Sequence, residues 1–253
     1  QYINVLWSGF KSPATVRQVQ TSRSEDFGQT WTAFVDIPNL SKNDFSAGFP
    51  DLTMSSSGQY VYATWRKTVG ALGSVATQFS RSEDFGATWT GGINLSPILF
   101  GIVASQPQIT TDKTGKYVYV CWRESGAFGN FIKMRRSTDF GRTFDNPVIL
   151  SRSVIVSAHR IVTDDVGRYV YIVWEESNEK YSILSFDFGI SFTTPLKISS
   201  QTDGSFIDPA LTMASSGIYA YAGFDRSSSF SIAQALRGVD IPRTVKRFKF
   251  TKP

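Results

Sequence analysis

A short pattern of hydrophobic and aromatic residues recurs along the whole chain. Each copy opens after a small polar turn that ends in glycine, continues through tyrosine and β-branched residues, and ends on a large aromatic residue. The copies are 58–65, 115–122, 167–174 and 217–224, and a fifth, 2–7, lacks the turn. Such runs after glycine-containing turns are typical of β-strands. We therefore expect five equivalent strands.

Other hydrophobic segments surround each of these strands in the same order. A short strand is expected before each glycine turn, at 51–54, 108–111, 160–163 and 210–213. A third strand follows the aromatic residue after a polar loop, at 16–22, 75–80, 131–136, 180–184 and 230–236, and a fourth is clearest at 34–37 and 148–150. Convincing helical periodicity is absent. Four short antiparallel strands repeated about every 50 residues predict an all-β chain built as a single β-propeller.

A second repeat falls between the third and fourth strands. Residues 22–32 read SRSEDFGQTWT, residues 80–90 read SRSEDFGATWT, and 135–145 and 184–194 are more divergent copies. The aspartate can accept hydrogen bonds from backbone N–H groups, and the glycine permits a backbone conformation that a Cβ would resist. The threonine and the aromatic residue then begin the next strand. Each copy is expected to close a hairpin.

These residues resemble the Asp-box, or bacterial neuraminidase repeat, of sialidases and other β-propellers. The first two copies match its Ser-x-Asp-x-Gly-x-Thr-Trp pattern, the third has Phe144 for tryptophan, and the fourth also has Ser191 for threonine. The resemblance implies that the box lies on the face away from the ligand site and is structural. The residues assigned this role are Asp26, Gly28, Trp31, Asp84, Gly86, Trp89, Asp139, Gly141, Phe144, Asp187, Gly189 and Phe192.

The repeats predict one domain over 1–253 with five blades. Their expected bounds are about 1–40 for blade 1, 50–96 for blade 2, 107–151 for blade 3, 159–199 for blade 4 and 209–242 for blade 5. Because the chain starts in a second strand, we expect the segment 244–250 to supply the missing first strand of blade 1 and close the ring. The alternatives are a disordered basic tail or a fragment of a larger ring.

Charge is concentrated at the C-terminal end. Residues 237–253 hold six basic residues and one aspartate, and 6 − 1 = +5 equals the net charge of the whole chain. The rest of the chain sums to zero, so we expect none of the basic stripe that a nucleic-acid partner requires. The basic end either contacts an anionic surface or is solvated.

Composition excludes several other classes of site. Cys121 is the single cysteine and is expected to be a small buried hydrophobic residue. No disulfide framework, metal-type spacing or phosphate loop is present, so we expect no metal and no cofactor. The longest apolar stretch, 98–104, is far shorter than the roughly 18 residues of a membrane-spanning helix. The chain begins with Gln1, which suits a removed leader or a chosen boundary. We expect a secreted or extracytoplasmic protein, although a single cysteine fits an intracellular one equally well.

Candidate ligand residues follow from the repeat. The framework positions are alike from blade to blade, whereas the residues after the strand-two aromatics and at the start of the inner strands differ in charge. These positions are expected on the face opposite the boxes, by analogy with other propellers. The candidate ligand-binding residues are Arg66, Arg123, Arg160, Asp51, Gln108, Glu175 and Asp225.

Three of these candidates, Arg66, Arg123 and Arg160, could converge on a carboxylate or sulfate. The resemblance implies an arginine triad for a sugar acid, but the closest match to the family's Phe/Tyr-Arg-Ile-Pro motif is His159-Arg160-Ile161-Val162, which lacks the proline. A Tyr–Glu nucleophile pair has no clear motif, although Tyr181 and Glu179 lie in a loop that could approach this face. The alternative is that the arginines pair with Asp51, Glu124, Glu175 and Glu176.

These observations favour a non-catalytic propeller that binds a glycan or a protein, with an anionic glycan preferred. One alternative is a sialidase-type exo-glycoside hydrolase, and another is a structural or assembly module. No catalytic residue is assigned, and a Ser-His-Asp triad around His159, the only histidine, is unsupported.

Overall fold

The computed structural model describes residues 2–10, 17–37, 44–69, 74–151, 156–177, 179–198, 209–226, 229–236 and 245–251. Backbone alone is described for 44–46, 69, 224–226, 229–236 and 245–251. Every regular element in these ranges is a β-strand, which confirms the predicted all-β class. The described residues include no helix long and apolar enough to cross a membrane.

The strands form antiparallel groups that repeat along the chain. The first group has three strands in the order β1 (Ile3–Phe10), β2 (Arg17–Ser24) and β3 (Val35–Ile37). The second group consists of β4 (Asp44–Met54), β5 (Val61–Val69), β6 (Ser74–Ser82) and β7 (Ile93–Asn94). The third consists of β8 (Val103–Thr111), β9 (Val118–Gly126), β10 (Gly129–Ser137) and β11 (Val148–Ile149). The fourth group consists of β12 (Val156–Thr163), β13 (Val170–Glu176), β14 (Glu179–Ser185) and β15 (Leu196–Lys197). The fifth consists of β16 (Ala210–Met213), β17 (Tyr219–Arg226), β18 (Ser229–Leu236) and β19 (Val245–Thr251).

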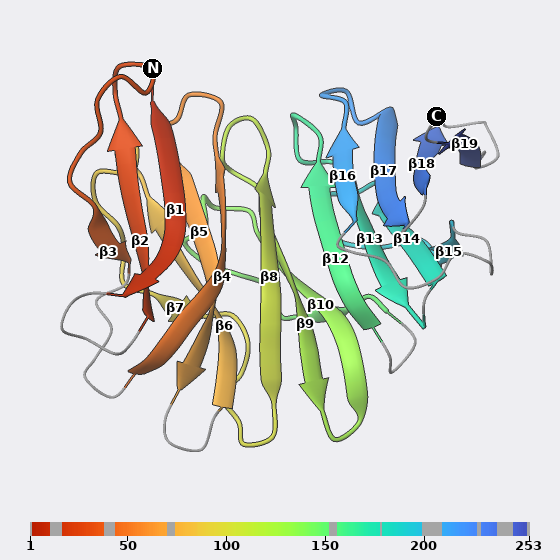
Figure 1. The fold of residues 1–253 in the computed structure, drawn as a ribbon, viewed down its shortest axis with the longest axis horizontal. Helices are drawn as coiled ribbons and strands as arrows, with labels where there is room; N and C mark the ends of the chain where they lie inside the picture. The colour runs from red at the N-terminus through yellow and green to blue at the C-terminus, as the bar shows by residue number, and fades with distance from the viewer. Residues whose placement is uncertain are drawn as a thin grey trace.

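The groups stand side by side in chain order. Figure 1 shows β4, β8, β12 and β16 next to one another across the molecule, each leading its own group. A single parallel bridge between Val75 and Val103 joins β6 to β8, so the second and third groups form one continuous eight-stranded sheet. The other neighbouring groups share no strand pairing among the described residues.

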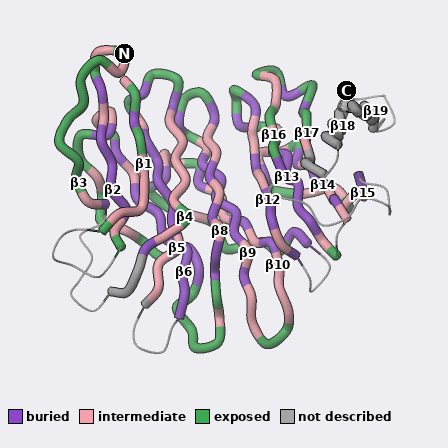
Figure 2. The backbone as a smooth tube through the Cα atoms, viewed as in Figure 1, coloured by how far each residue is buried: buried purple, intermediate pink, exposed green. Residues whose placement is uncertain are grey.

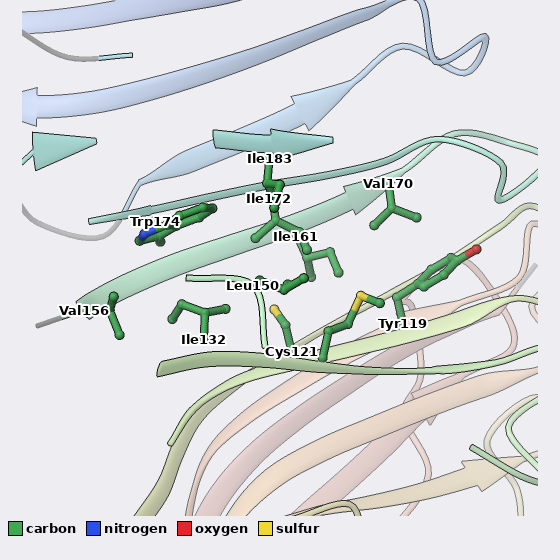
Figure 3. Packing of buried hydrophobic residues seen from close by; sticks show 11 residues of the cluster. Tyr119, Cys121, Ile132, Leu150, Val156, Ile161, Val170, Ile172, Trp174 and Ile183 are labelled. Atoms are coloured by element: carbon green, nitrogen blue, oxygen red, sulfur yellow. The ribbon is translucent and has the colours of Figure 1, made fainter. Parts of the chain in front are cut away.

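Hydrophobic cores lie between neighbouring groups. Figure 3 shows one of them, where Cys121 and Ile132 of the third group meet Ile161 and Trp174 of the fourth. Trp122 occupies the equivalent place between the second and third groups. A sheet with two apolar faces requires a neighbour on each side, and this arrangement provides it. Figure 2 shows that burial follows the strands rather than the loops.

The glycine turns connect each group to the next. The hydroxyl of Tyr62 donates to the carbonyl of Gly115, and that of Tyr119 donates to Gly167, both at 2.6 Å. A parallel series of backbone bonds runs through the same turns, from Ser56 N to Lys113 O, Lys113 N to Asp165 O and Asp165 N to Ser215 O, each 2.9 Å. The groups are therefore held together at the upper end in Figure 1 by contacts that repeat.

The last strand corrects one prediction. β19 pairs antiparallel with β18 over its whole length, from Val245 opposite Ala235 to Thr251 opposite Ser229. It completes the final group, whereas among the described residues the first group contains β1, β2 and β3 alone. β1 and β19 lie on opposite sides of the molecule (Figure 1). The expectation that 244–250 would pair in blade 1 is wrong because β18 offers a free edge close in sequence, and a short connection costs less entropy than a distant one.

Candidate functional site

The four aspartate turns (24–31, 82–89, 137–144 and 185–192) share one geometry. In the second, Asp84 Oδ1 accepts from Ser82 Oγ at 2.7 Å and from Thr88 N at 2.8 Å, while Oδ2 accepts from Thr88 Oγ1 at 2.6 Å. The same three contacts recur at Asp26, Asp139 and Asp187. These hydrogen bonds lower the pKa of Asp26 to about 2. Each carboxylate is engaged within its own turn.

Three backbone bonds place the aspartate turns and the glycine turns at the same end of the molecule. Phe85 N donates to Gln59 O, Phe140 N to Lys116 O and Phe188 N to Arg168 O. The residues after the strand-two aromatics and the starts of the inner strands are therefore at the opposite end. We call this second end the open end, and it carries the arginines singled out in the sequence.

Each of three inner strands is distorted at the open end. The pairing register slips by one residue between Gly48 and Asp51 in β4, between Ser105 and Gln108 in β8, and between Val156 and His159 in β12. Phe49 and Gln106 adopt a positive φ of 52° at the slip. A bulge bends its strand and re-aims the next side chain, and bulges are common beside functional sites. Here they re-aim Asp51, Gln108 and Arg160.

Asp51 bridges two inner strands. Its Oδ2 accepts from Ile109 N on β8 at 2.9 Å, and its Oδ1 accepts from Leu52 N at 3.1 Å. Burial raises the pKa of the Asp51 carboxyl, while these N–H groups and the positive charge of Arg160 act in the opposite direction. Asp51 therefore lies within electrostatic reach of Arg160 and also holds β4 against β8.

The three candidate arginines have different contacts. Arg66 places its guanidinium 5.0 Å from the ring centre of Phe49, and its buried Nε has no hydrogen-bond partner. Arg123 donates from Nη2 to Ser105 Oγ at 3.3 Å and likewise has an unpartnered buried Nε. Arg160 donates from Nη1 to the carbonyl of His159 at 3.1 Å.

The acidic residues that could neutralise these arginines are engaged elsewhere. Glu124 pairs with Lys133, and Glu175 pairs with Lys180. Glu176 accepts from Trp174 Nε1 at 2.9 Å. Glu175, a predicted ligand residue, is instead buried with the ammonium of Lys180, because a buried lysine requires a counter-charge. Within the described chain, Arg66 and Arg123 form no ion pair.

His159 is the most unusual residue of the open end. It precedes Arg160, whereas a proline stands at the equivalent position before Asp51 and before Gln108. Its side chain is 2% exposed. The backbone of Cys121 and Ser157 lies close to the ring, but neither ring nitrogen reaches hydrogen-bond geometry. Burial, together with the nearby charges of Arg160 and Arg123, lowers the pKa of His159 to about 4. The imidazole is therefore neutral at pH 7.

The structure thus brings some of the predicted ligand residues together and not others. Asp51, Arg160 and Arg123 share one electrostatic neighbourhood around His159. Gln108 donates to the carbonyl of Pro107 at 3.2 Å, and the side chain of Asp225 lies outside the described residues. Sequence reasoning missed the bulges and the burial of His159, although Pro50 and Pro107 before the inner strands were a usable signal.

The Tyr181–Glu179 pair lies away from the inner strands. Tyr181 Oη donates to Glu179 Oε2 at 2.8 Å, and Glu179 also pairs with Lys197 on β15. The tyrosine ring stacks on Trp174 with centroids 6.0 Å apart. The hydrogen bond to Glu179 raises the pKa of Tyr181, which opposes formation of a phenolate nucleophile. Among the residues placed by the structure, no cluster of His, Cys, Asp and Glu could hold a metal ion.

Comparisons with known proteins identify the fold. No family model matches the sequence, and no curated protein does either. The Hadza microbial sialidase Hz136 matches with a TM-score of 0.62 and 15% identity over 95% of this chain and 55% of its own. The GH93 α-L-arabinofuranosidase of Fusarium graminearum, in complex with arabinobiose, gives 0.63 and 14% over 100% and 78%. The K499G mutant of NanB sialidase from Streptococcus pneumoniae gives 0.55 and 14% over 83% and 32%.

These likenesses establish a sialidase-like β-propeller fold at low sequence identity. The chain spans about half the length of the Hadza sialidase and about a third of NanB. The matching structures include sialidases, arabinofuranosidases and an arabinanase, which are proteins that act on carbohydrates.

Proposed function

We propose that the open end binds an anionic glycan without cleaving it. The observation that carries this proposal is that Arg66 and Arg123 form no ion pair with any residue that the structure describes. The carboxylates of Glu124 and Glu175 already pair with lysines, so they do not neutralise either arginine. A guanidinium that forms no ion pair within the described residues is poised to bind an anion supplied from outside.

The neighbouring groups fit a carboxylated or sulfated sugar. Arginine binds such groups through paired N–H donors in a fixed fork. The ring of His159 is buried and neutral, so it adds no positive charge beside the arginines and does not itself contact the sugar. Asp51 contributes a carboxylate to the neighbourhood, and its two backbone hydrogen bonds hold it in place.

A sialidase-type hydrolase is the second candidate, because the solved structures with this fold include sialidases. The geometry favours it less. The Tyr181–Glu179 pair is on β14, two strands out from β12, and its hydrogen bond holds the phenol protonated. An uncleaved ligand therefore suits this chain better than a substrate.

We also infer that the five groups of strands are five blades of the propeller, with the bounds expected from the sequence except that 245–251 belongs to the last blade and not to the first. The repeated contacts between neighbouring groups support this inference. The outer faces of the first and last groups are more exposed than the faces between groups. Trp31 in the first group is 44% exposed and Tyr221 in the last is 41% exposed, whereas Tyr62 in the second group is buried. A secreted location is proposed from the carbohydrate-related fold.

The test is a titration with sialyllactose, a sulfated disaccharide and neutral lactose, followed by calorimetry. We expect saturable binding of the anionic sugars only, and roughly tenfold or greater loss in Arg123→Ala. Arg142→Ala is the matched control, because Arg142 is an exposed arginine at the aspartate-turn end. Equal binding of lactose, or equal loss in both variants, would refute the proposal. Turnover of a fluorogenic sialoside would favour the hydrolase.

A further inference from the structure

Two loops at the open end expose large hydrophobic side chains. Phe128, at the tip of the β9–β10 hairpin, is 89% exposed, and Phe100, in the loop before β8, is 78% exposed. These are the most exposed large hydrophobic side chains among the described residues. Ile98 and Leu99 are exposed in the same loop as Phe100. We call these four residues the apolar tip.

The two loops form one surface. Val103 pairs with Ser125, which brings the end of the first loop beside the base of the hairpin. A Cβ on Gly126 would lie only 2.7 Å from Ile102 Cδ1, so the hairpin and the loop are in direct contact. Figures 1 and 2 show both loops at the lower edge of the molecule, with their exposed parts outermost.

Charge is absent from the apolar tip and present behind it. Residues 91–111 and 125–132 contain no Lys, Arg, Asp or Glu. Arg123, which forms no ion pair in the described chain, lies on β9, five residues before Phe128. An uncharged apolar projection followed by a cation matches the order of a bilayer from its interior outward, in which hydrocarbon comes first and the phosphates follow.

We propose that the apolar tip inserts into the surface of a lipid bilayer, with Arg123 facing the lipid phosphates. Exposed apolar clusters on soluble folds mark sites of interaction. The apolar tip projects outward and has no polar side chains at its apex, which suits acyl chains better than a sugar's hydroxyl groups. Shallow insertion of Phe and Leu side chains supported by basic residues gives reversible membrane binding. This inference does not require the glycan proposal.

The first experiment places an environment-sensitive dye at the tip. Cys121 is the only cysteine and is fully buried, so Phe128→Cys can be labelled selectively with a nitrobenzoxadiazole group. Phe27→Cys is the matched control, because Phe27 is 68% exposed in an aspartate turn at the opposite end. Vesicles of phosphatidylcholine with a minority of phosphatidylglycerol should raise and blue-shift the emission at position 128 and leave position 27 unchanged.

The second experiment measures partitioning by vesicle flotation. The double variant Phe100→Ser, Phe128→Ser should bind vesicles roughly tenfold more weakly, since two phenyl rings no longer leave water. The double variant Phe27→Ser, Ile190→Ser removes exposed apolar area from the opposite end and should bind as the parent does. Equal melting temperatures establish that both variants are folded.

Three results would overturn the proposal. They are absence of vesicle binding by the parent protein, equal dye responses at positions 128 and 27, and equal flotation of the two double variants. If the Phe100→Ser, Phe128→Ser variant instead loses only sialyllactose binding, the apolar tip contacts sugar and not lipid. Because these vesicles contain no glycan, failure of the glycan proposal leaves the outcome unaffected.

Discussion

The two ends of the same strands differ in how regular their hydrogen bonding is. At the aspartate-turn end, four turns repeat one set of hydrogen bonds, and each glycine turn is bonded to the next. At the open end, three inner strands are bulged, and buried polar atoms of Arg66, Arg123 and His159 lack partners. The difference separates two tasks, because one end fixes the sheets and the other is left free to vary its chemistry.

The first sheet shows what the repeated contacts contribute. Asn4 stands where Tyr62 and Tyr119 stand in later groups, three residues before the strand-two tryptophan. Its amide is buried against Gly86 and has no hydrogen-bond partner, whereas the two tyrosines reach a carbonyl in the next turn. A shorter side chain at this position leaves the connection to the next group unmade.

The largest expected effect tests the close packing of the aspartate turns. Gly141 has φ +72°, and a Cβ there would lie 2.7 Å from Phe79 Cζ, so Gly141→Ala should destabilise by about 2–4 kcal/mol. Gly101→Ala is a matched control, since Gly101 has φ +78° and nothing within 4 Å. It should lose only about 1 kcal/mol from backbone strain. Urea unfolding of both variants measures the difference, and equal losses would contradict the role of packing.

The next effect concerns pH at the open end. His159 has a pKa of about 4 in the folded chain, below its usual value of 6.5, so the unfolded state binds more protons between these values. Stability is therefore full above pH 6.5 and falls as the pH drops to 4, by up to about 3 kcal/mol. His159→Leu should remove most of this slope. Asp26, with a pKa of about 2, loses its contribution only below about pH 4.

The pH experiment consists of urea unfolding at several pH values between 7 and 4 for the parent and for His159→Leu. An unchanged slope in the variant would show that other groups cause the acid sensitivity, and that burial of His159 carries no energetic cost.

A smaller effect isolates one connection between groups. Tyr119→Phe removes only the hydroxyl that donates to Gly167, and it should cost about 1 kcal/mol, because a buried carbonyl loses its donor. Tyr60→Phe is the control, as the Tyr60 ring packs on Phe140 with centroids 4.6 Å apart and can do so without the hydroxyl. Thermal melts of the two variants should differ by a few degrees. If they coincide, the hydroxyl bond adds little to the packing.

The smallest expected effect is on stability at the open end. Arg123→Ala removes a guanidinium that makes one long hydrogen bond and no ion pair in the described structure, so the free energy of unfolding should change by less than about 0.5 kcal/mol. The same variant should bind the anionic glycan more weakly. A large loss of stability would mean that Arg123 is part of the framework, and the contrast between the two ends would fail.

Local chemistry explains how far the sequence could be interpreted. The strand after each glycine turn, the aspartate turns and the all-β class depend on residues within about ten positions of each other, and all were predictable from pattern. The ion pair between Glu175 and Lys180 was not predictable, although the two residues are only five positions apart. The sequence does not show which face of this strand is buried. The pairing of β19 with β18 also escaped prediction, since two free edges competed for it.

By itself, the sequence determined the repeating unit, because turn chemistry and strand periodicity act over a few neighbouring residues. Tertiary structure alone decided which charges remain uncompensated, how the bulges re-aim Asp51 and Arg160, and that His159 is buried beside two arginines. These features depend on contacts between groups about 50 residues apart. Their energies are set by burial and by distance between charges, and neither is encoded in any single repeat.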